Sequence, residues 1–311
     1  MNEASVLHAP LWVRIASTLI RRLPAGRYRV MNEFCRRPPS VFLMPMHEDM
    51  GGFTFECDLR DAISREVCFT GRYEPQETAL VQSILLPGMT FVDVGANWGY
   101  FTLLAAHLVG SDGRVISLEP DPRLFTILQE STIRNHLKHV VALQVAAASK
   151  DGTLKLAGYR ESGNNFGVSR IVSEVEHECM FDVIARPLDK LCEELGLDTV
   201  DLLKMDIEGF EGDALLGLDN SLRNRRIKRL LIELHPAEIA ENGQSVKGII
   251  GQLRDFGYRP WQLDHSKVTS RRAAYSKHYD FRNSLRPFDE DADLDDWPHV
   301  LWTMPGLDVL W

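Results

Sequence analysis

The sequence predicts an α/β fold in which a mostly parallel sheet is covered by helices on both faces. Short apolar runs alternate with segments of helical length from residue 90 to residue 263, and such alternation is typical of parallel sheets buried on both sides. In addition, the apolar run 90–94 leads directly into a glycine turn and then a helix. Ligands of such sheets bind at the carboxyl ends of the strands, so we expect a binding site at that edge.

Strands are expected where apolar residues cluster between turn signals. Pro87-Gly88 introduces the first strand, and Asp151-Gly152 is the turn of a hairpin-like excursion. The expected strands are 90–94, 115–118, 140–145, 154–156, 200–205, 230–234 and 258–263. Residues 40–67 are mixed and favour short strands and loops. Residues 158–181 are polar and irregular, as in an active-site loop.

Helices are expected between these strands. Asp121 is a suitable N-cap, and Pro122 suits the first helical position after it. The expected helices are 11–23, 76–85, 100–108, 122–135, 188–195, 211–216 and 246–256. In the first of them Leu11, Ile15 and Leu19 recur at helical spacing. We favour a helix that packs on the main domain or on a second copy of the chain; an anionic membrane surface is the alternative.

Three regions follow from these patterns. Residues 1–70 form an N-terminal helical or irregular extension, and residues 71–265 form the α/β domain. Residues 266–311 are polar and then rich in Trp and Pro, which favours a C-terminal appendage, either a lid or a dimer arm. A homo-oligomer is therefore one expectation for the assembled protein.

Composition excludes several classes of protein. The net charge of −9 argues against a nucleic-acid binder, which needs an excess of Lys and Arg on one face. The five cysteines form no CxxC pair, so neither a disulfide framework nor a cysteine-based zinc site is implied. No transmembrane run or secretory signal is apparent. We expect a cytoplasmic protein.

The glycine turn carries the first ligand signal. Gly95 permits close approach of a ligand, and Gly99 lets the following helix begin tight against the strand. Asp93 can meet an ammonium group, directly or through water. Glu119 ends the next strand, where an acidic side chain accepts ribose hydroxyls. Together these features suit S-adenosylmethionine and hence methyl transfer, although a glycine turn alone also occurs without a cofactor.

Carboxylates after the strand 200–205 carry the second signal. Asp206, Glu208 and Glu211 can act as a base, as metal ligands or as partners of a polar substrate. Glu211 is equally explained as a helix N-terminal acid. His235 ends the strand 230–234 beside Glu233 and can take a proton from a hydroxyl, and a purely structural role for His235 is as well supported.

The chain resembles the FkbM-type family of S-adenosylmethionine-dependent methyltransferases. The resemblance covers about residues 71–265. The matching segments are GRYEP (71–75), FVDVGANWGYFTLLAA (91–106), VISLEPDP (115–122), VAAAS (145–149), LLKMDIEGFE (202–211) and LLIELHP (230–236). Their order and spacing agree with the family, and the set is much more specific than any one motif.

The resemblance implies a Rossmann-like class I methyltransferase fold with a seven-stranded, mostly parallel sheet whose last strand is reversed. It implies O-methyl transfer to hydroxyls of sugars or secondary metabolites. The expected cofactor-binding residues are Asp93, Gly95, Ala96, Asn97, Gly99, Glu119, Pro120, Asp121 and Asp206. Tyr73, Glu74, Glu208 and Glu233 are candidates on the acceptor side.

The expected reaction is an in-line attack of an acceptor hydroxyl on the methyl group. His235 or Asp206 is the expected base, and a divalent ion held by Asp206, Glu208 or Glu233 is another way to stabilise an alkoxide. These possibilities remain open. The polar residues Asn164, Asn165 and Ser169 favour a saccharide or another hydroxyl-rich acceptor.

Two other functions are alternatives to methyl transfer. A nicotinamide dehydrogenase requires G-x-G-x-x-G, whereas this turn has Asn97 in place of the second glycine. A non-catalytic module that binds S-adenosylmethionine, acting as a scaffold or regulator, remains the alternative to the enzyme.

Overall fold

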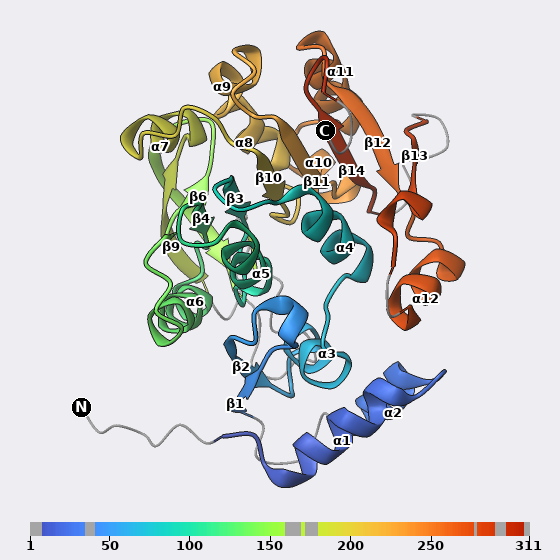
Figure 1. Ribbon diagram of the computed structural model, residues 1–311. Coiled ribbons are helices and arrows are strands. Elements are labelled where there is room, and N and C mark those ends of the chain that lie inside the picture. Colours follow the sequence, from blue (N-terminus) through green and yellow to red (C-terminus); the bar gives the residue numbers. More distant parts are fainter. Residues whose placement is uncertain are drawn as a thin grey trace, which may run out of the picture.

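A large mixed sheet forms the centre of the computed structural model (Figure 1), which describes residues 8–34, 41–158, 169–171, 180–276, 279–289 and 297–307. In spatial order its eight described strands are β13 (Leu285–Pro287), β12 (Arg259–Leu263), β14 (His299–Thr303), β11 (Arg229–Glu233), β10 (Leu202–Met205), β3 (Thr90–Val94), β4 (Arg114–Leu118) and β5 (Val140–Leu143). The strands from β11 to β5 pair in parallel. The expected α/β class is confirmed.

Two strands of the sheet run opposite to the others, β14 and the edge strand β13. β14 pairs antiparallel with β11 on one side and with β12 on the other, as the family resemblance implies. The sheet has eight described strands instead of seven because β13 adds a short antiparallel edge to β12.

The interpretation of residues 266–311 as an appendage was wrong for this strand. β14 belongs to that segment, and its central residues Val300, Leu301 and Trp302 are all 0% exposed. The segment also contains α12 (Lys267–Tyr275), the short helix η2 (Phe281–Asn283) and β13. A strand buried on both faces reads as a continuous apolar run, but β14 has five residues and only the central three, Val300 to Trp302, are apolar, which is too short to stand out in the sequence.

Helices cover both faces of the sheet. Phe91 and Val92 of β3 belong to different hydrophobic clusters because successive side chains of a strand point to opposite faces. The first cluster contains side chains of α4 (Pro75–Ile84) and α5 (Tyr100–Val109). The second contains side chains of α7 (Leu188–Glu194), α8 (Glu211–Leu216), α9 (Asp219–Arg223), α10 (Pro236–Glu241) and α11 (Val246–Asp255).

The N-terminal region packs on the face that carries α5. It comprises α1 (Leu11–Arg22), α2 (Arg27–Asn32), β1 (Val41–Pro45), η1 (Glu48–Met50), β2 (Thr54–Asp58) and α3 (Ala62–Thr70). Val13 and Ile20 of α1 lie in the same cluster as the sheet residue Phe91. The expected packing of this helix on the domain is confirmed, while the helix α3 was missed.

The opposite face of α1 is exposed at Leu11, Ile15 and Leu19. No described helix is both long and apolar enough to cross a bilayer. Contact of this exposed face with a membrane surface or a second copy of the chain stays a prediction.

A second, smaller sheet follows β5 in the chain. Its order is β6 (Ala146–Ala147), β9 (Met180–Arg186), β7 (Gly152–Ala157) and β8 (Arg170–Ile171). β7 follows the expected turn at Asp151-Gly152 and pairs antiparallel with β9, so its main partner is more distant than a local hairpin strand. Asn164 and Asn165 lie outside the described residues.

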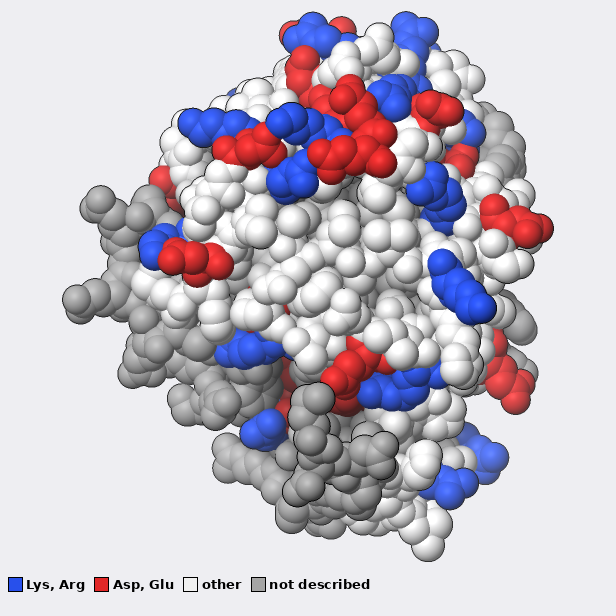
Figure 2. All heavy atoms as spheres, turned by 90° about the vertical axis from the view of Figure 1, so that its left-hand side faces the viewer, with Lys and Arg blue, Asp and Glu red and all other residues white. Residues whose placement is uncertain are grey.

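Charges on the face shown in Figure 2 are mixed, with acidic and basic side chains next to one another rather than gathered in one basic area. Ion pairs near β9 and α7 are of this mixed kind, since Arg186 of β9 contacts both Asp151 and Glu194.

The remaining helix, α6 (Pro122–Arg134), follows β4. It begins as expected, because the carboxylate of Asp121 accepts a hydrogen bond from the Arg123 amide and Pro122 is the first helical residue.

Candidate active site

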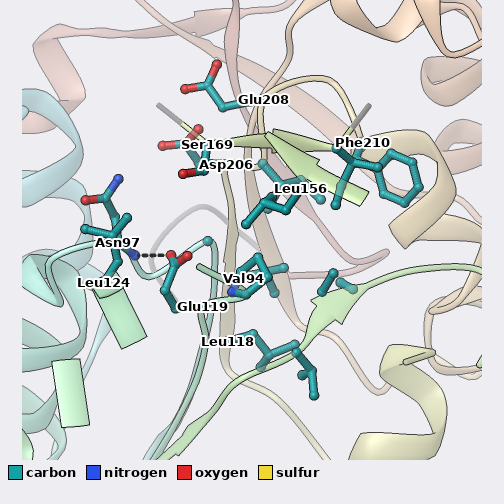
Figure 3. Close-up of a pocket in the computed structure, with 17 residues that line it drawn as sticks. Val94, Asn97, Leu118, Glu119, Leu124, Leu156, Ser169, Asp206, Glu208 and Phe210 are labelled. Carbon is teal, nitrogen blue, oxygen red and sulfur yellow. Dashed lines mark hydrogen bonds between the residues drawn. The ribbon is translucent and has the colours of Figure 1, made fainter. Parts of the chain in front are cut away.

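A pocket lies at the carboxyl edge of the parallel strands (Figure 3). The ends of β3, β4 and β10 form its floor, and residues near β6, β7 and β8 form its wall. The lining residues are Val94, Gly95, Asn97, Leu118, Glu119, Pro120, Leu124, Val145, Ala146, Ala147, Leu156, Ser169, Ile171, Asp206, Ile207, Glu208 and Phe210. The pocket therefore combines an apolar wall with three carboxylates.

The turn after β3 requires glycine at Gly95. Its φ is +85°, and a Cβ there would lie 2.0 Å from the carbonyl oxygen of Asp206. Its amide donates a hydrogen bond to the Leu118 carbonyl at 3.0 Å. Gly99 is also constrained, because a Cβ would lie 2.7 Å from Cδ1 of Leu128 on α6. The turn is thus held close to β4, β10 and α6 at once.

Glu119 faces the pocket from the end of β4. It is 4% exposed, and its two carboxylate oxygens accept hydrogen bonds from the backbone amides of Asn97 at 2.7 Å and Asp121 at 2.9 Å. Figure 3 shows the bond from Asn97. Burial raises the pKa of Glu119 to about 8, although both amides favour the carboxylate.

Asp121 does not line the pocket itself but contacts a residue that does. It is fully buried, and in addition to capping α6 it accepts a hydrogen bond from the Ser169 hydroxyl at 2.8 Å. Its ion pair with Arg123 measures 2.6 Å. Asp121 therefore positions Ser169, which does line the pocket, while Pro120 lines it directly.

Asp93 lies beneath the turn rather than in the pocket lining. It is 0% exposed, and one carboxylate oxygen accepts a hydrogen bond from the Thr102 hydroxyl at 2.7 Å. Its Oδ1 atom has no hydrogen-bond partner among the described residues, and burial raises its pKa. Ala96 and Gly99 also lie outside the lining. The expected contact of Asp93 with an ammonium group stays a prediction.

Asp206 connects the pocket to a second group of acids. The buried Lys204 donates a hydrogen bond to it at 3.2 Å. Burial alone would raise the pKa of Asp206, but Lys204 and His235 together hold it below its usual value. In turn, burial would lower the pKa of Lys204, and Asp206 with its neighbouring carboxylates raises it instead. The two groups therefore hold each other charged.

Glu74 and Glu233 complete this group. One carboxylate oxygen from each of them and one from Asp206 lie within 4.8 Å of one another. Burial, together with neighbouring carboxylates, raises the pKa of Glu233 to about 10 and that of Glu74 to about 7. At neutral pH the group thus carries shared protons. Tyr73, which precedes Glu74, packs edge-on against Tyr100.

The orientation of His235 is fixed by Glu211, which the sequence analysis could also explain as a helix N-terminal acid. Its Nδ1 lies 2.9 Å from Oε1 of the fully buried Glu211. Its Nε2 lies 3.5 Å from Glu208 and 3.8 Å from Glu233. Burial lowers the pKa of His235, but Glu211 outweighs this and raises it to about 9.

Comparison with known proteins identifies the family of the chain. The family model described as "Methyltransferase FkbM domain" matches residues 93–260, which is more than half of the chain. The chain belongs to the FkbM methyltransferase family. The resemblance stated from the sequence motifs is confirmed.

Relatives of this FkbM chain include named methyltransferases. Methyltransferase 1 of Beauveria bassiana is 31% identical over 42% of this chain and 58% of its own length. Methyltransferase sdnD of Sordaria araneosa is 28% identical over 43% and 62%. The 2-O-methyltransferase NoeI of Sinorhizobium fredii is 23% identical over 57% and 76%. The chain thus spans about three fifths of the length of the Beauveria and Sordaria relatives.

A solved FkbM methyltransferase from Methylobacillus flagellatus aligns with a TM-score of 0.43 and 15% identity, over 93% of this chain and 58% of that one. The fold assignment rests on the strand order and on the family match.

The FkbM motifs meet at two adjoining places. Of the expected cofactor residues, Gly95, Asn97, Glu119, Pro120 and Asp206 line one pocket, and their contact with a cofactor stays a prediction. Glu208 lines it as well, and its carboxylate lies within 4.8 Å of donor atoms of both Asp206 and His235. The sequence analysis assigned no role to Lys204 and left two interpretations open for Glu211. Both stand inside the motif at 202–211, but burial and partners are not visible in a motif.

Proposed function

We propose that this FkbM chain transfers a methyl group from S-adenosylmethionine to a hydroxyl of a sugar or secondary-metabolite acceptor. One observation carries the proposal. Asp206 and Glu208 line the pocket of the glycine turn and also belong to the group of His235. A cofactor in that pocket and an acceptor near His235 would therefore meet at the same two side chains.

The residues present fit S-adenosylmethionine, which supplies an activated methyl group when bound. Glu119 offers carboxylate oxygens at a strand end where ribose hydroxyls bind in related sheets. Leu124, Ala147 and Leu156 provide an apolar wall for an adenine ring. Asp206, held ionised by Lys204, supplies negative charge for a cationic sulfur. Gly95 lines the pocket without a side chain of its own.

The acidic group can accept the hydroxyl proton. Burial and Asp206 raise the pKa of Glu208 to about 7, near the value at which a general base works best at neutral pH. His235 lies 3.5 Å from Glu208, and its pKa of about 9 keeps it protonated at neutral pH, so its positive charge stabilises the Glu208 carboxylate. We therefore assign proton acceptance to Glu208, with His235 as its positively charged partner and Asp206 as a neighbouring negative charge.

A bound divalent ion is the other way to hold a deprotonated hydroxyl. Asp206, Glu208 and His235 offer donor atoms within 4.8 Å of one another, and carboxylate oxygens with one imidazole suit Mg²⁺ or Mn²⁺. Activity that disappears with a chelator and returns with Mg²⁺ would assign this role to an ion.

We infer the class of acceptor from the carboxylates of the site and from the name of one relative. A neighbourhood rich in carboxylates hydrogen-bonds to hydroxyl groups, which are donors. One relative is named a 2-O-methyltransferase, which supports oxygen as the atom methylated.

The first test is calorimetric titration of S-adenosylhomocysteine into the wild-type protein and into Glu119→Ala. We expect micromolar binding that collapses in the variant. A panel of sugars and hydroxylated metabolites with labelled S-adenosylmethionine then tests turnover, and His235→Ala should keep cofactor affinity but lose turnover. Absence of binding to folded wild-type protein would contradict the proposal. Binding without turnover on a broad panel would favour the scaffold alternative.

A further inference from the structure

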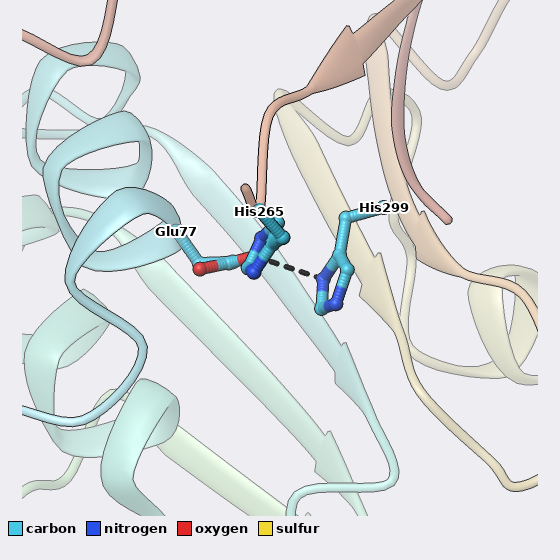
Figure 4. A group of neighbouring side chains, drawn as sticks. All are labelled: Glu77, His265 and His299. Carbon is cyan, nitrogen blue, oxygen red and sulfur yellow. Dashed lines mark hydrogen bonds and ion pairs between the residues drawn. The ribbon is translucent and has the colours of Figure 1, made fainter. Parts of the chain in front are cut away.

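Three metal-binding side chains from distant segments meet outside the pocket (Figure 4). Glu77 comes from α4, His265 from the loop after β12, and His299 from the first position of β14. Nε2 of His265 lies 2.5 Å from Oε1 of Glu77, and Nδ1 of His299 lies 2.8 Å from the same oxygen. The three donor atoms all lie within 4.8 Å of one another.

The centre of this group is a buried carboxylate with an unused oxygen. Glu77 is 1% exposed, and its Oε2 atom has no hydrogen-bond partner among the described residues. A buried carboxylate oxygen without a partner is costly. A cation at this position would give Oε2 of Glu77 the partner that it lacks among the described residues.

A second carboxylate orients one of the histidines. Nε2 of His299 lies 3.5 Å from Oε1 of Glu233, on the ring edge opposite the nitrogen that faces Glu77. Histidines that bind metals characteristically direct their other ring nitrogen to a carboxylate, which fixes the tautomer and strengthens the ligand. The imidazole rings of His265 and His299 are stacked, with centroids 3.9 Å apart, so both present a nitrogen to the same space.

The group is accessible from one side. The side chain of His265 is 32% exposed, and this residue lines an open pocket together with Gln76 and Ser270. His299 is 10% exposed and closes the inner side. An ion can therefore enter from the pocket, and water can complete its coordination there.

We propose that Glu77, His265 and His299 bind a divalent transition-metal ion of the zinc class. Two imidazoles and one carboxylate are a known zinc ligand set, whereas Mg²⁺ and Ca²⁺ prefer oxygen alone. Ligands about 2.0–2.2 Å from zinc lie about 3.3 Å apart, so the 2.5 Å contact of His265 and the 2.8 Å contact of His299 with Glu77 need to open by about 0.8 and about 0.5 Å. The half-exposed His265 can supply most of that movement.

The bound ion would join α4, the loop after β12 and β14. It would therefore hold the reversed strand against the helix that follows Tyr73 and Glu74. Through Glu233 it also contacts the acidic group of the proposed active site, but its binding does not depend on methyl transfer.

The test uses the full-length protein stripped of metal and titrated with ZnCl₂ or CoCl₂. We expect one equivalent to bind, visible absorption bands from Co²⁺ with imidazole ligands, and a higher midpoint of thermal unfolding with Zn²⁺. His265→Ala should weaken binding at least about 100-fold, and Glu233→Gln by about 10- to 100-fold. Because His265 lies at the surface, its variant should fold even where His299→Ala does not.

Two controls locate the ion. His47→Ala removes an exposed histidine that pairs with Asp49 and should not change binding. Asp206→Asn with Glu208→Gln removes the acids of the proposed active site and should also leave zinc binding intact. Loss of zinc in that double variant with retention in His265→Ala would place the ion in the acidic group and overturn the proposal. Failure of folded wild-type protein to take up either ion would also overturn it.

Discussion

The pocket at the glycine turn and the acidic group beside it both hold carboxylates at strand ends, but they stabilise them differently. Glu119 is held by two backbone amides, from the turn after β3 and from its own loop. Asp206 is instead balanced by side chains from other positions in the fold, chiefly Lys204 and His235. The first arrangement depends on the backbone and the second on individual side chains.

This difference determines how each place can be disrupted. Backbone amides persist through almost any substitution, so the environment of Glu119 fails only when the turn itself changes shape. The acidic group fails when Lys204, Asp206 or His235 loses its charge, since a buried charge left without its partner is strongly destabilising. Three experiments test this contrast, beginning with the largest expected effect.

Gly95→Ala should damage the pocket most. The new Cβ would lie 2.0 Å from the Asp206 carbonyl oxygen at a φ of +85°, so the turn must move away from β10. We expect binding of S-adenosylhomocysteine to weaken more than about 100-fold, with a loss of at least about 3 kcal/mol in the free energy of unfolding. Calorimetry and urea unfolding measure the two effects.

Gly88→Ala is the matched control. Gly88 has a φ of +84°, but no atom lies within 4 Å of a Cβ built there. This variant should cost only the conformational strain, about 1–2 kcal/mol, and leave ligand affinity unchanged. Equal loss of affinity in both variants would show that the close approach to Asp206 is unimportant.

Glu211→Gln should affect the acidic group and spare the pocket. Without the carboxylate, the pKa of His235 falls from about 9 toward its ordinary value of about 6.5, and the ring loses its orientation. We expect turnover to fall about 100-fold while affinity for S-adenosylhomocysteine is kept. Glu241→Gln, at an exposed glutamate, is the control and should change neither quantity.

The same variant has a pH signature in stability. The raised pKa of His235 stabilises the wild-type fold fully below about pH 6.5, and this contribution disappears as the pH rises through about 9. The difference in unfolding free energy between wild type and Glu211→Gln should therefore shrink over that range. A difference that stays constant with pH would mean that Glu211 does not raise the pKa of His235.

The smallest expected effect is a release of protons from Glu119 when S-adenosylhomocysteine binds. The pKa of about 8 that Glu119 has in the free protein should fall when ribose hydroxyls donate to the carboxylate. Affinity for S-adenosylhomocysteine should then rise by up to about tenfold per pH unit between pH 6 and 8, with release of up to one proton. Calorimetry in buffers of different ionisation enthalpy measures the release, and Glu119→Gln should release none. A pH-independent affinity in wild type would contradict the linkage.

The contrast also explains what the sequence could predict. The glycine turn, Glu119 and the cap at Asp121 are local features, because each depends on residues close together in the chain. Their placement was predictable from spacing alone. Only the position of Asp93 was less clear, since a strand residue next to a turn can point either to the ligand or beneath it.

The acidic group depends on topology instead. Glu74 precedes α4, Asp206 follows β10 and Glu233 ends β11. They meet only through the fold, because β10 and β11 are neighbouring strands and Glu74 comes from a distant part of the chain. For the same reason the sequence could not decide whether Glu211 acts at the site or only stabilises the N-terminus of a helix. Its partner His235 stands in another of the recognised motifs.

The insertion of β14 has a consequence for synthesis of the protein on the ribosome. β11 and β12 are made well before His299, and until β14 emerges they are not bridged by any strand that the structure describes. The nascent chain therefore exposes the unpaired edges of two apolar strands, which are templates for association with other chains. Completion of the sheet is thus a late event, and His299 reaches Glu77 and Glu233 only with it.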